Sequence, residues 1–296
     1  MNGRILVTGA QGLLGRALVT GLRAKGIAIP ATGRRAPAAD DMDYQQADLC
    51  DRDAVEALFD AGDLQAVVHT AAQIRASGDD GDSCFFRNNV LATTHLAEAA
   101  RATDTQQFVN CSTISVYNGE GPYDELSSPT VPGIPYGRSK LAAEYLLNAR
   151  SGMGMRILNL RLAGLHGGDR DSGVVYHMMR NALAGAPLAV SEPESRFNLC
   201  FVEDVVAALP ALLADAGPEG CETLNFANPE AFSLAELAGK ILRVAGSESP
   251  VEPGEAPARN REMHLERLCR RLPVAMAAPD VHLEKLARRL RSEGAQ

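Results

Sequence analysis

A tyrosine and a lysine stand one helical turn apart in the segment Tyr136-Gly137-Arg138-Ser139-Lys140. Residues at i and i+4 share one face of a helix, so a phenol and an ammonium group could meet at one substrate atom. The chain has six Tyr and only four Lys, so chance supplies fewer than about 0.1 such spacings. A tyrosine of ordinary pKa, about 10, is a weak base at neutral pH, and a neighbouring cation lowers that pKa. The pair therefore predicts proton transfer to or from a hydroxyl or ketone.

A second candidate group lies in the segment NCSTIS at residues 110–115, which follows an apolar run. A hydroxyl at the carboxyl end of a strand, such as that of Thr113, can hydrogen-bond the same substrate oxygen and position it. The alternatives are a satisfied strand-end hydroxyl for Thr113 and a surface aromatic at a helix start for Tyr136. Together with the cofactor turn described next, the catalytic interpretation is favoured for Thr113, Tyr136 and Lys140.

A glycine-rich turn near the N-terminus is a candidate site for a dinucleotide cofactor. It lies between an apolar run at residues 4–8 and a segment of helical period. Gly9 allows a tight turn, Gly12 lets the backbone approach a pyrophosphate, and Gly15 permits close packing of helix on strand. The helix N-terminus then presents exposed N–H groups to the phosphates, whereas the alternative is a purely structural turn. The expected cofactor contacts here are Gly9, Gln11, Gly12, Leu13, Leu14 and Gly15.

The end of the second predicted strand indicates which nicotinamide cofactor binds. A site for NAD(H) places a carboxylate there to accept from the ribose 2′-hydroxyl. This chain has Arg34 and Arg35 instead, and guanidinium groups suit the 2′-phosphate of NADP(H). The sequence therefore favours NADP(H) over NAD(H), the alternative being that one or both arginines point into solvent. Further contacts are expected after the third and fourth strands, at Asp48, Leu49, Thr70, Ala71 and Ala72.

The apolar pattern of the first 160 residues predicts the scaffold that positions these groups. Short apolar runs alternate with segments of helical period, one of them behind a cap at Asp51 or Asp53. Such repetition implies right-handed crossovers and a doubly wound, Rossmann-like parallel sheet. Pro30 conflicts with the second strand, because proline removes a ladder donor. The predicted strands are Arg4–Thr8, Ile27–Thr32, Tyr44–Asp48, Ala66–Thr70, Gln107–Ser112 and Arg156–Leu162.

After residue 165 the alternation loosens. We place a dinucleotide-binding domain at residues 1–165 and expect residues 166–296 to form mainly a smaller, mixed α/β substrate-binding cap. The chain is expected to cross back to the core near residues 197–230. Residues 246–260 are rich in Pro, Gly, Ser and Glu and are predicted to be a loop. Other predicted elements are helices at Gly173–Ala184, Glu203–Ala214 and Ser233–Ala245 and strands at Leu188–Val190 and Thr223–Phe226.

The composition limits the classes of partner. A net charge of −8 disfavours a nucleic-acid or anionic membrane surface, which would need a positive field. No apolar run approaches about 18 residues and no signal peptide is evident, so no membrane segment is expected. The six cysteines stand singly without metal-ligand spacing, so we expect no metal and a reducing, cytoplasmic setting. Arginines near the C-terminus alternate with glutamates and are interpreted as a solvated helix face.

Taken together, the motifs resemble the extended short-chain dehydrogenase/reductase family, the NAD(P)-dependent sugar epimerase, dehydratase and reductase group. The similarity covers about residues 3–245 and rests on TGAQGLLG, HTAA, NNVLATTHLAEAA, STISVY, YGRSK, RLAGLHG, FVEDVV and NFANPEAFSLAEL. It implies that the three catalytic candidates form the family's triad, with Lys140 also on the nicotinamide ribose. It implies that Asn89 supports the active-site helix and that Leu162 lines the nicotinamide.

The resemblance also implies a homodimer, in which helices at about 88–102 and 136–150 pair across the interface as a four-helix bundle. Departures from the family pattern narrow the reaction. Sugar-nucleotide 4,6-dehydratases carry Asp-Glu after the threonine, whereas Ile114 follows it here, which disfavours dehydration. The arginine that binds a nucleotide-sugar diphosphate in relatives is replaced by Phe197, with an arginine one place away. Candidate substrate contacts are Ser115, His166, Arg196 and Asn198, although a packed turn histidine is an equally good interpretation of the second.

These inferences predict an NADP(H)-dependent oxidoreductase that acts on a sugar or sugar nucleotide, as a 4-ketoreductase or 4-epimerase. Arg34 and Arg35 favour net reduction by NADPH, since an epimerase regenerates its own cofactor and usually retains NAD. One alternative is a reductase or dehydrogenase of a small non-nucleotide hydroxy or keto compound. Another is a non-catalytic NADP-sensing protein, but such a protein would have no use for Tyr136 and Lys140.

Overall fold

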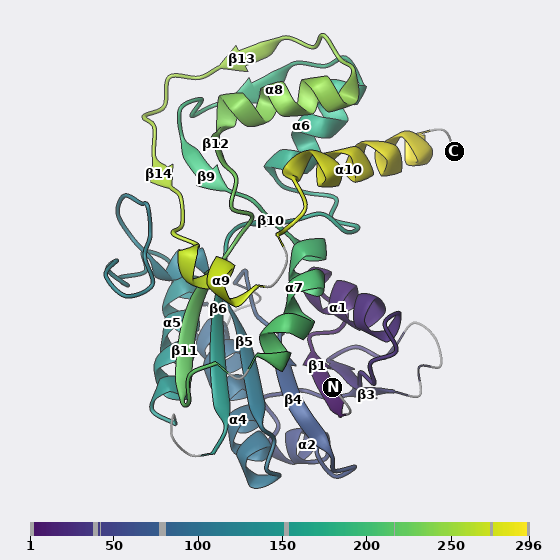
Figure 1. The fold of residues 1–296 in the computed structure, drawn as a ribbon, viewed down its shortest axis with the longest axis vertical. Helices are drawn as coiled ribbons and strands as arrows, with labels where there is room; N and C mark the ends of the chain where they lie inside the picture. The colour runs from purple at the N-terminus through teal and green to yellow at the C-terminus, as the bar shows by residue number, and fades with distance from the viewer. Residues whose placement is uncertain are drawn as a thin grey trace. The chain divides into compact units, whose positions relative to one another are not determined.

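The computed structural model describes residues 3–37, 41, 43–76, 81–150, 154–215, 217–272 and 275–294. The chain forms two compact units, each made of discontinuous segments (Figure 1). Unit 1 comprises Met1–Asn118, Pro129–Leu162 and Val206–Leu224. Unit 2 comprises Gly119–Ser128, Ala163–Val205 and Asn225–Gln296.

Unit 1 is built on a seven-stranded parallel sheet in the order β3-β2-β1-β4-β5-β6-β11. The order reverses between β1 and β4, and this is the point at which doubly wound sheets bind ligands. The sheet confirms the Rossmann-like fold that the alternating pattern predicted. Its strands are β1 (Arg4–Thr8), β2 (Ala31–Gly33), β3 (Tyr44–Gln46), β4 (Leu64–His69), β5 (Gln107–Thr113), β6 (Arg156–Leu162) and β11 (Cys221–Phe226).

Strands β2 and β3 are shorter than the sequence predicted. β2 begins at Ala31, because Pro30 before it has no N–H and contributes only its carbonyl, which accepts from the N–H of Val7 at 2.9 Å. β3 ends at Gln46, so Asp48 lies in the turn beyond the strand rather than at its end. There its carboxylate accepts from the N–H of Cys50 at 3.0 Å.

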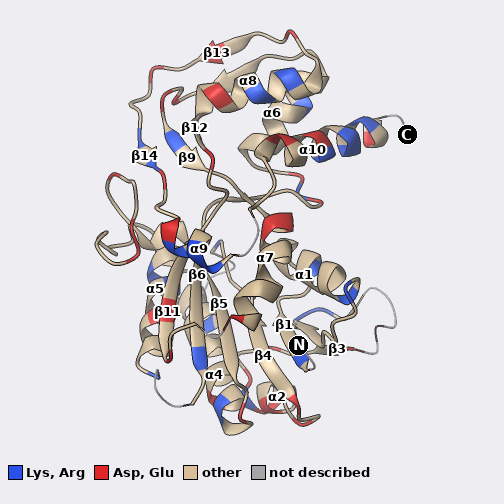
Figure 2. Cartoon of the chain, in the orientation of Figure 1, with Lys and Arg blue, Asp and Glu red and all other residues tan. Residues whose placement is uncertain are grey.

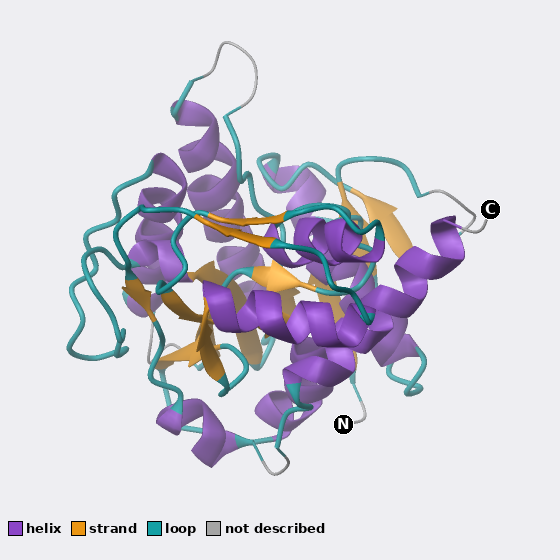
Figure 3. Ribbon diagram, turned by 90° about the horizontal axis from the view of Figure 1, so that it is seen from above, coloured by secondary structure: helices purple, strands orange, loops and turns teal. Residues whose placement is uncertain are grey.

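Helices cover both faces of this sheet (Figures 1 and 3). On one face Gly21 of α1 packs so closely against Val206 of α7 that a Cβ at this glycine would overlap it. Helix α2 begins where predicted, since the carboxylate of Asp51 accepts from two N–H groups of its first turn. The helices of this unit are α1 (Leu13–Arg23), α2 (Arg52–Glu56), α3 (Ser83–Phe85), the π-helix η2 (Phe86–Leu91), α4 (Ala92–Ala102), α5 (Pro135–Asn148) and α7 (Val202–Ala214), the last of which starts in unit 2.

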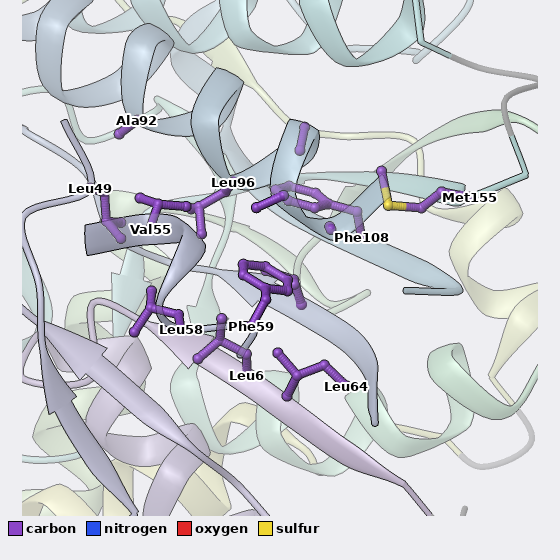
Figure 4. Close-up of a cluster of buried hydrophobic side chains, with 14 of the residues drawn as sticks. Leu6, Leu49, Val55, Leu58, Phe59, Leu64, Ala92, Leu96, Phe108 and Met155 are labelled. Carbon is purple, nitrogen blue, oxygen red and sulfur yellow. The ribbon is translucent and has the colours of Figure 1, made fainter. Parts of the chain in front are cut away.

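The hydrophobic core of unit 1 lies between the sheet and helices α2, α4 and α5. Four side chains in register across neighbouring strands form its floor: Leu6, Val67, Phe108 and Ile157. Figure 4 shows two of them among apolar side chains from the covering helices. Two residues further along each strand, the same face carries polar side chains instead. The apolar core thus ends two residues before this polar row. The candidate site lies at the carboxyl ends of the strands, beyond the core.

Unit 2 packs α6 (Val174–Leu183), α8 (Leu234–Ala245) and α10 (Pro279–Gly294) around its own apolar core. Charges of both signs are interspersed along α10 (Figure 2). Helix α8 is fixed by a capping box between Ser233 and Glu236. Among the described residues, no helix has the length and apolar character needed to cross a bilayer. The remaining elements are short: β7 (Leu165–His166), β8 (Leu188–Val190), β9 (Arg196–Asn198), β10 (Cys200–Phe201), β12 (Ala231–Ser233), β13 (Val251–Pro253), β14 (Asn260–Arg261) and α9 (Glu266–Arg271).

The predicted loop at residues 246–260 was partly wrong. Val251–Pro253 forms β13 and pairs with β8 in parallel, and Asn260 begins β14 beside β9. Both strands are held by partners more than 60 positions away in the sequence, so local composition carries no sign of them.

Candidate active site

The glycine turn packs against the residues that follow β4. Gly9 has a positive φ of 68°, and a Cβ there would lie 2.6 Å from the backbone nitrogen of Ala71. A side chain at this position would therefore be strained and would clash with backbone. A Cβ at Gly15 would overlap the carbonyl of Gly9 and lie 2.9 Å from Oγ1 of Thr70. Thr70 in turn donates to the carbonyl of Thr8 at 2.6 Å, which fixes the two strand ends side by side.

The turn has the donors that a pyrophosphate requires. Helix α1 begins after Gly12, and among the described residues no side chain hydrogen-bonds to cap it. Its first turn also carries no acidic residue, so its N–H groups are left for an anion. Gln11 braces the turn, because its amide nitrogen donates to the carbonyls of Arg35 at 3.1 Å and Ala36 at 2.8 Å. These residues fit a dinucleotide cofactor.

The structure brings Thr113, Tyr136 and Lys140 together at the end of β5. Helix α5 starts with Pro135 at its first position, which places Tyr136 in the first turn and Lys140 one turn later. The phenol of Tyr136 faces Thr113. Burial raises the pKa of Tyr136 to about 12, against a smaller lowering by the Thr113 hydroxyl. The phenol is therefore protonated at neutral pH.

Lys140 is one of the largest fully buried side chains of the protein, with only 1% of it exposed. Burial lowers the pKa of Lys140 to about 8. Its Nζ donates to Oδ1 of Asn110 at 3.3 Å. The lowering of the Tyr136 pKa that we predict from Lys140 and an oxidised nicotinamide concerns the cofactor-bound protein; in this structure, burial dominates and raises this pKa.

Asn89 connects the active-site helix to the loop after β4. It lies in the π-helix η2, a form that often occurs at functional sites. Its Oδ1 accepts from the N–H of Gln73 at 2.7 Å, and its Nδ2 donates to Oγ of Ser139 at 2.9 Å. Ser139 donates to the carbonyl of Tyr136 at 2.8 Å. The side chain thus lies where a residue supporting α5 should be.

The other predicted cofactor residues occupy varied environments. Leu162 ends β6 in register with Thr113, next to the catalytic candidates. Leu49 is buried in the apolar core, and Asp48 beside it is exposed. Arg34 is exposed, and its guanidinium lies 3.4 Å from Oδ1 of Asn88. Their cofactor contacts remain predictions.

Three of the predicted substrate residues lie in unit 2 and have partners within it. His166 is buried beside Phe201, and burial lowers its pKa to about 3. Asn198 donates to the carbonyl of Asn228 at 3.0 Å and accepts from a backbone N–H. Arg196 forms ion pairs with two glutamates. Ser115, in unit 1, donates its N–H to Oγ1 of Thr113 at 3.2 Å. Their substrate roles remain predictions.

Several residues that shape the site were not singled out from the sequence. Gly137 packs against the carbonyl of Ser115, and a Cβ there would overlap it. Glu144, two turns after Tyr136, forms a buried ion pair with Arg161 at 2.7 Å and hydrogen-bonds Ser112. The available signals were a glycine directly after the candidate tyrosine and charged residues at core positions of α5 and β6. Within the described part of the chain, no group of three or more His, Cys, Asp or Glu could hold a metal ion.

Comparison with known proteins decides the family. The model of the NAD dependent epimerase/dehydratase family matches residues 5–226. The chain belongs to this family. The resemblance that the sequence motifs carried is thereby confirmed, and the protein is an enzyme of the NAD dependent epimerase/dehydratase family.

Relatives within the family differ in their reactions. The UDP-glucose 4-epimerase of Mycolicibacterium smegmatis is 30% identical over 284 residues, covering 90% of this chain and 89% of that protein. The 3-diazoavenalumate denitrifying reductase of a Streptomyces species is 30% identical over 261 residues, covering 83% of each. The solved structure of MoeE5 in complex with UDP-glucuronic acid and NAD is 28% identical, with a TM-score of 0.79, and covers 97% of this chain and 99% of that one.

Proposed function

We propose that this protein reduces a ketone, or epimerises a secondary alcohol, at C4 of a nucleotide-activated or related sugar. The observation that carries the proposal is the placement of Tyr136 beside Thr113 at the end of β5, with the buried ammonium of Lys140 one helical turn away. Two neighbouring hydroxyl groups at a strand end can both contact one substrate oxygen. That arrangement is what proton transfer to a carbonyl requires.

The protonation states favour the direction of reduction. A nicotinamide cofactor, when bound, supplies or accepts a hydride at the substrate carbon. Tyr136, protonated because its pKa is about 12, donates its phenolic proton to the ketone oxygen. Thr113 donates a hydrogen bond to the same oxygen and orients it. Lys140, with a pKa of about 8, is mostly charged at neutral pH and stabilises the phenolate that remains.

NADP(H) is the cofactor that the residues after β2 favour. Arg34 and Arg35 are exposed there, where the 2′-phosphate of NADP(H) would lie. Titrating NADPH and NADH into the purified protein by fluorescence tests this preference. Replacing both arginines by serine should weaken NADPH binding about 10- to 100-fold and leave NADH binding unchanged, because a charged hydrogen bond contributes roughly 1.5–3 kcal/mol. Arg101→Ser, at the exposed end of α4, is the control. Equal losses for both cofactors would refute the assignment.

A sugar nucleotide is the substrate class that the relatives favour. One is named as a UDP-glucose 4-epimerase, and the structure of another holds a UDP-sugar. Ile114 and Ser115 stand where a dehydratase needs an acid and a base, which argues for redox chemistry without loss of water.

A small, non-nucleotide keto compound is the second candidate substrate. Arg196, the residue nearest to the expected diphosphate-binding position, is engaged by Glu262 and Glu236. A cation already paired with two carboxylates is less available to a diphosphate. A relative of equal identity, the 3-diazoavenalumate denitrifying reductase, is not named for a sugar substrate.

The exposed apolar surface of η2 and α5 supports a homodimer through these helices. Phe86 is 44% exposed, Leu91 is 40% exposed and Tyr145 is 59% exposed. Large apolar side chains on neighbouring helices mark an interaction surface when they gather in one patch. Sedimentation should give twice the mass of the 296-residue chain for the wild type and half that value for Tyr145→Glu with Leu91→Glu. A monomeric wild type would refute the dimer.

Turnover assays test the reaction. A panel of UDP-4-keto sugars and simple ketones with NADPH is followed at 340 nm, and conversion of UDP-glucose into its C4 epimer is followed separately. Tyr136→Phe should lower turnover about 10²- to 10⁴-fold while sparing cofactor binding. Tyr145→Phe, on the same helix but exposed, is the matched control. An unchanged rate in Tyr136→Phe would overturn the role of this tyrosine.

A further inference from the structure

A row of polar side chains crosses the sheet of unit 1 just above its apolar core. Thr8, His69, Asn110 and Asn159 are paired in register on β1, β4, β5 and β6. All four are at most 1% exposed. Buried polar side chains are destabilising unless each is hydrogen-bonded, so an unbroken row of them indicates a specific role. Of these four residues, Asn110 contacts Lys140, which lies on α5.

The hydrogen bonds of the row fix the orientation of the Asn110 amide. Its Nδ2 donates to Oδ1 of Asn159 at 2.8 Å, which leaves its Oδ1 to accept from Nζ of Lys140 at 3.3 Å. Nδ2 of Asn159 in turn donates to Sγ of Cys221 at 3.3 Å, so its own amide cannot turn over without losing a partner. A chain of three side chains on β5, β6 and β11 therefore presents an acceptor to the lysine.

The other groups around Lys140 do not replace this acceptor. His69 is neutral, since burial lowers its pKa to about 3, and both its ring nitrogens lie within 3.1 Å of threonine hydroxyls. Cys111 is a neutral thiol, since burial raises its pKa to about 12. Glu144 attracts the ammonium, but its carboxylate oxygens are engaged by Arg161 and Ser112. Tyr136 is a neutral phenol, since burial raises its pKa to about 12.

We propose that Asn110 is the positioning residue of Lys140: the buried amide chain Asn110–Asn159–Cys221 presents Asn110 Oδ1 to the ammonium group and holds it charged at the site. The inference rests on the proposed function, because it concerns the lysine of the same site. It extends that function by naming what stabilises a buried cation that forms no ion pair with any of the residues that the structure describes. A hydrogen bond to a charged group in a low-dielectric interior favours the charged form.

Lysine NMR tests the proposal without any substrate. The chain has only Lys25, Lys140, Lys240 and Lys285, so protein labelled with ¹³C and ¹⁵N at lysine gives few side-chain signals. The signal missing from Lys140→Met identifies the buried amine, and a pH titration then measures its pKa. Asn110→Leu removes the acceptor and should lower this pKa by about one to two units. Asn110→Asp adds a carboxylate and should raise it by about one to three units.

Two further variants separate positioning from a general structural effect. Asn159→Leu leaves Asn110 in place but frees the Asn110 amide to turn, so this variant should lower the pKa of Lys140 by a smaller amount. The same variant tests the proposal if Asn110→Leu does not fold. Thr93→Val removes a hydrogen bond to His69 in the same buried layer and should leave the pKa of Lys140 unchanged. A Lys140 pKa that stays within about 0.3 units of the wild-type value in the folded Asn110 and Asn159 variants overturns the proposal.

The outcome is distinct from that of the proposed function. Opposite shifts in Asn110→Leu and Asn110→Asp, together with an unchanged rate in Tyr136→Phe, would sustain the positioning of Lys140 and overturn the reaction. Loss of turnover in Tyr136→Phe with no shift in the Asn110 variants would do the reverse.

Discussion

Gly137→Ala is the substitution that most directly separates packing at the site from the stability of its helix. Gly137 lies inside α5, where replacing glycine by alanine normally stabilises a helix by roughly 0.5–1 kcal/mol. Here the added Cβ would overlap the carbonyl oxygen of Ser115 and lie 2.9 Å from Cβ of Pro132. The sign of the effect therefore depends on whether the overlap or the helix propensity dominates.

The geometry makes the overlap dominant. Carbon atoms in contact lie about 3.5–4.0 Å apart, so relief of the contact with Pro132 alone requires a shift of about 0.6 Å or more. The Ser115 carbonyl is backbone in a 3₁₀ turn, η3 (Ile114–Val116), that follows Thr113, and it cannot swing aside as a flexible side chain could. We expect α5 to move by about 1 Å, a destabilisation of about 1–3 kcal/mol, and a fall in turnover of about 100-fold, because Tyr136 moves with the helix.

Urea unfolding and steady-state kinetics on the same preparations measure both effects. Gly133→Ala is the matched control, because it makes the same chemical change four residues earlier at a site with no neighbour within 4 Å. It should be neutral or stabilising by up to about 1 kcal/mol. If Gly137→Ala proves as stable and as active as Gly133→Ala, the close packing of α5 on the Thr113 turn does not set the site.

Other substitutions probe further polar and ionisable groups of unit 1. Glu144→Gln should lower the free energy of unfolding by about 3–5 kcal/mol in urea, because it leaves Arg161 buried and uncompensated. Replacing both members by Leu and Met should recover most of that loss, and a double variant no better than the single would contradict this account. Cys111 has a folded-state pKa of about 12 against an ordinary 9.0, so its contribution to stability is present below pH 9 and lost as the pH rises toward 12. From pH 8 to about pH 10.5 the wild type should lose about 2 kcal/mol relative to Cys111→Ala, whereas its difference from Val109→Ala should stay constant. Asp51→Ala should cost about 0.5–2 kcal/mol in thermal or urea unfolding through loss of the α2 cap, and an unchanged midpoint would refute that role.

Much of the fold could be predicted because its signals are local. Arg4–Thr8, Arg156–Leu162 and Leu188–Val190 were predicted with the bounds that the structure shows, since each is a short apolar run between turn residues. β13 and β14 were missed, because neither VEP nor NR is an apolar run and both strands are defined by their pairing with distant segments. Pro30 conflicted with the predicted second strand, and in the structure that strand begins directly after this proline.

The candidate site likewise contains residues that local spacing predicts and residues that come together only in the folded chain. The glycine turn and the Tyr136–Lys140 spacing could be singled out as candidates because the proposed chemistry uses residues that are near in sequence. Asn110 could not be linked to Lys140 in advance, because the two meet only after α5 folds back onto β5. A polar residue inside the apolar stretch FVNC was the visible sign, and it had no partner to be matched with.

The amide chain behind the lysine also affects how the enzyme reaches its working state. Asn110 and Asn159 are 49 positions apart, and Asn159 and Cys221 are 62 apart, so three strands must be in register before the chain closes. Contacts of such long sequence separation form slowly, because loop entropy is lost before they contribute. During refolding, the circular dichroism signal of the helices should therefore return well before the activity that depends on Lys140. An activity assay would then report the last assembly step of the sheet rather than its first.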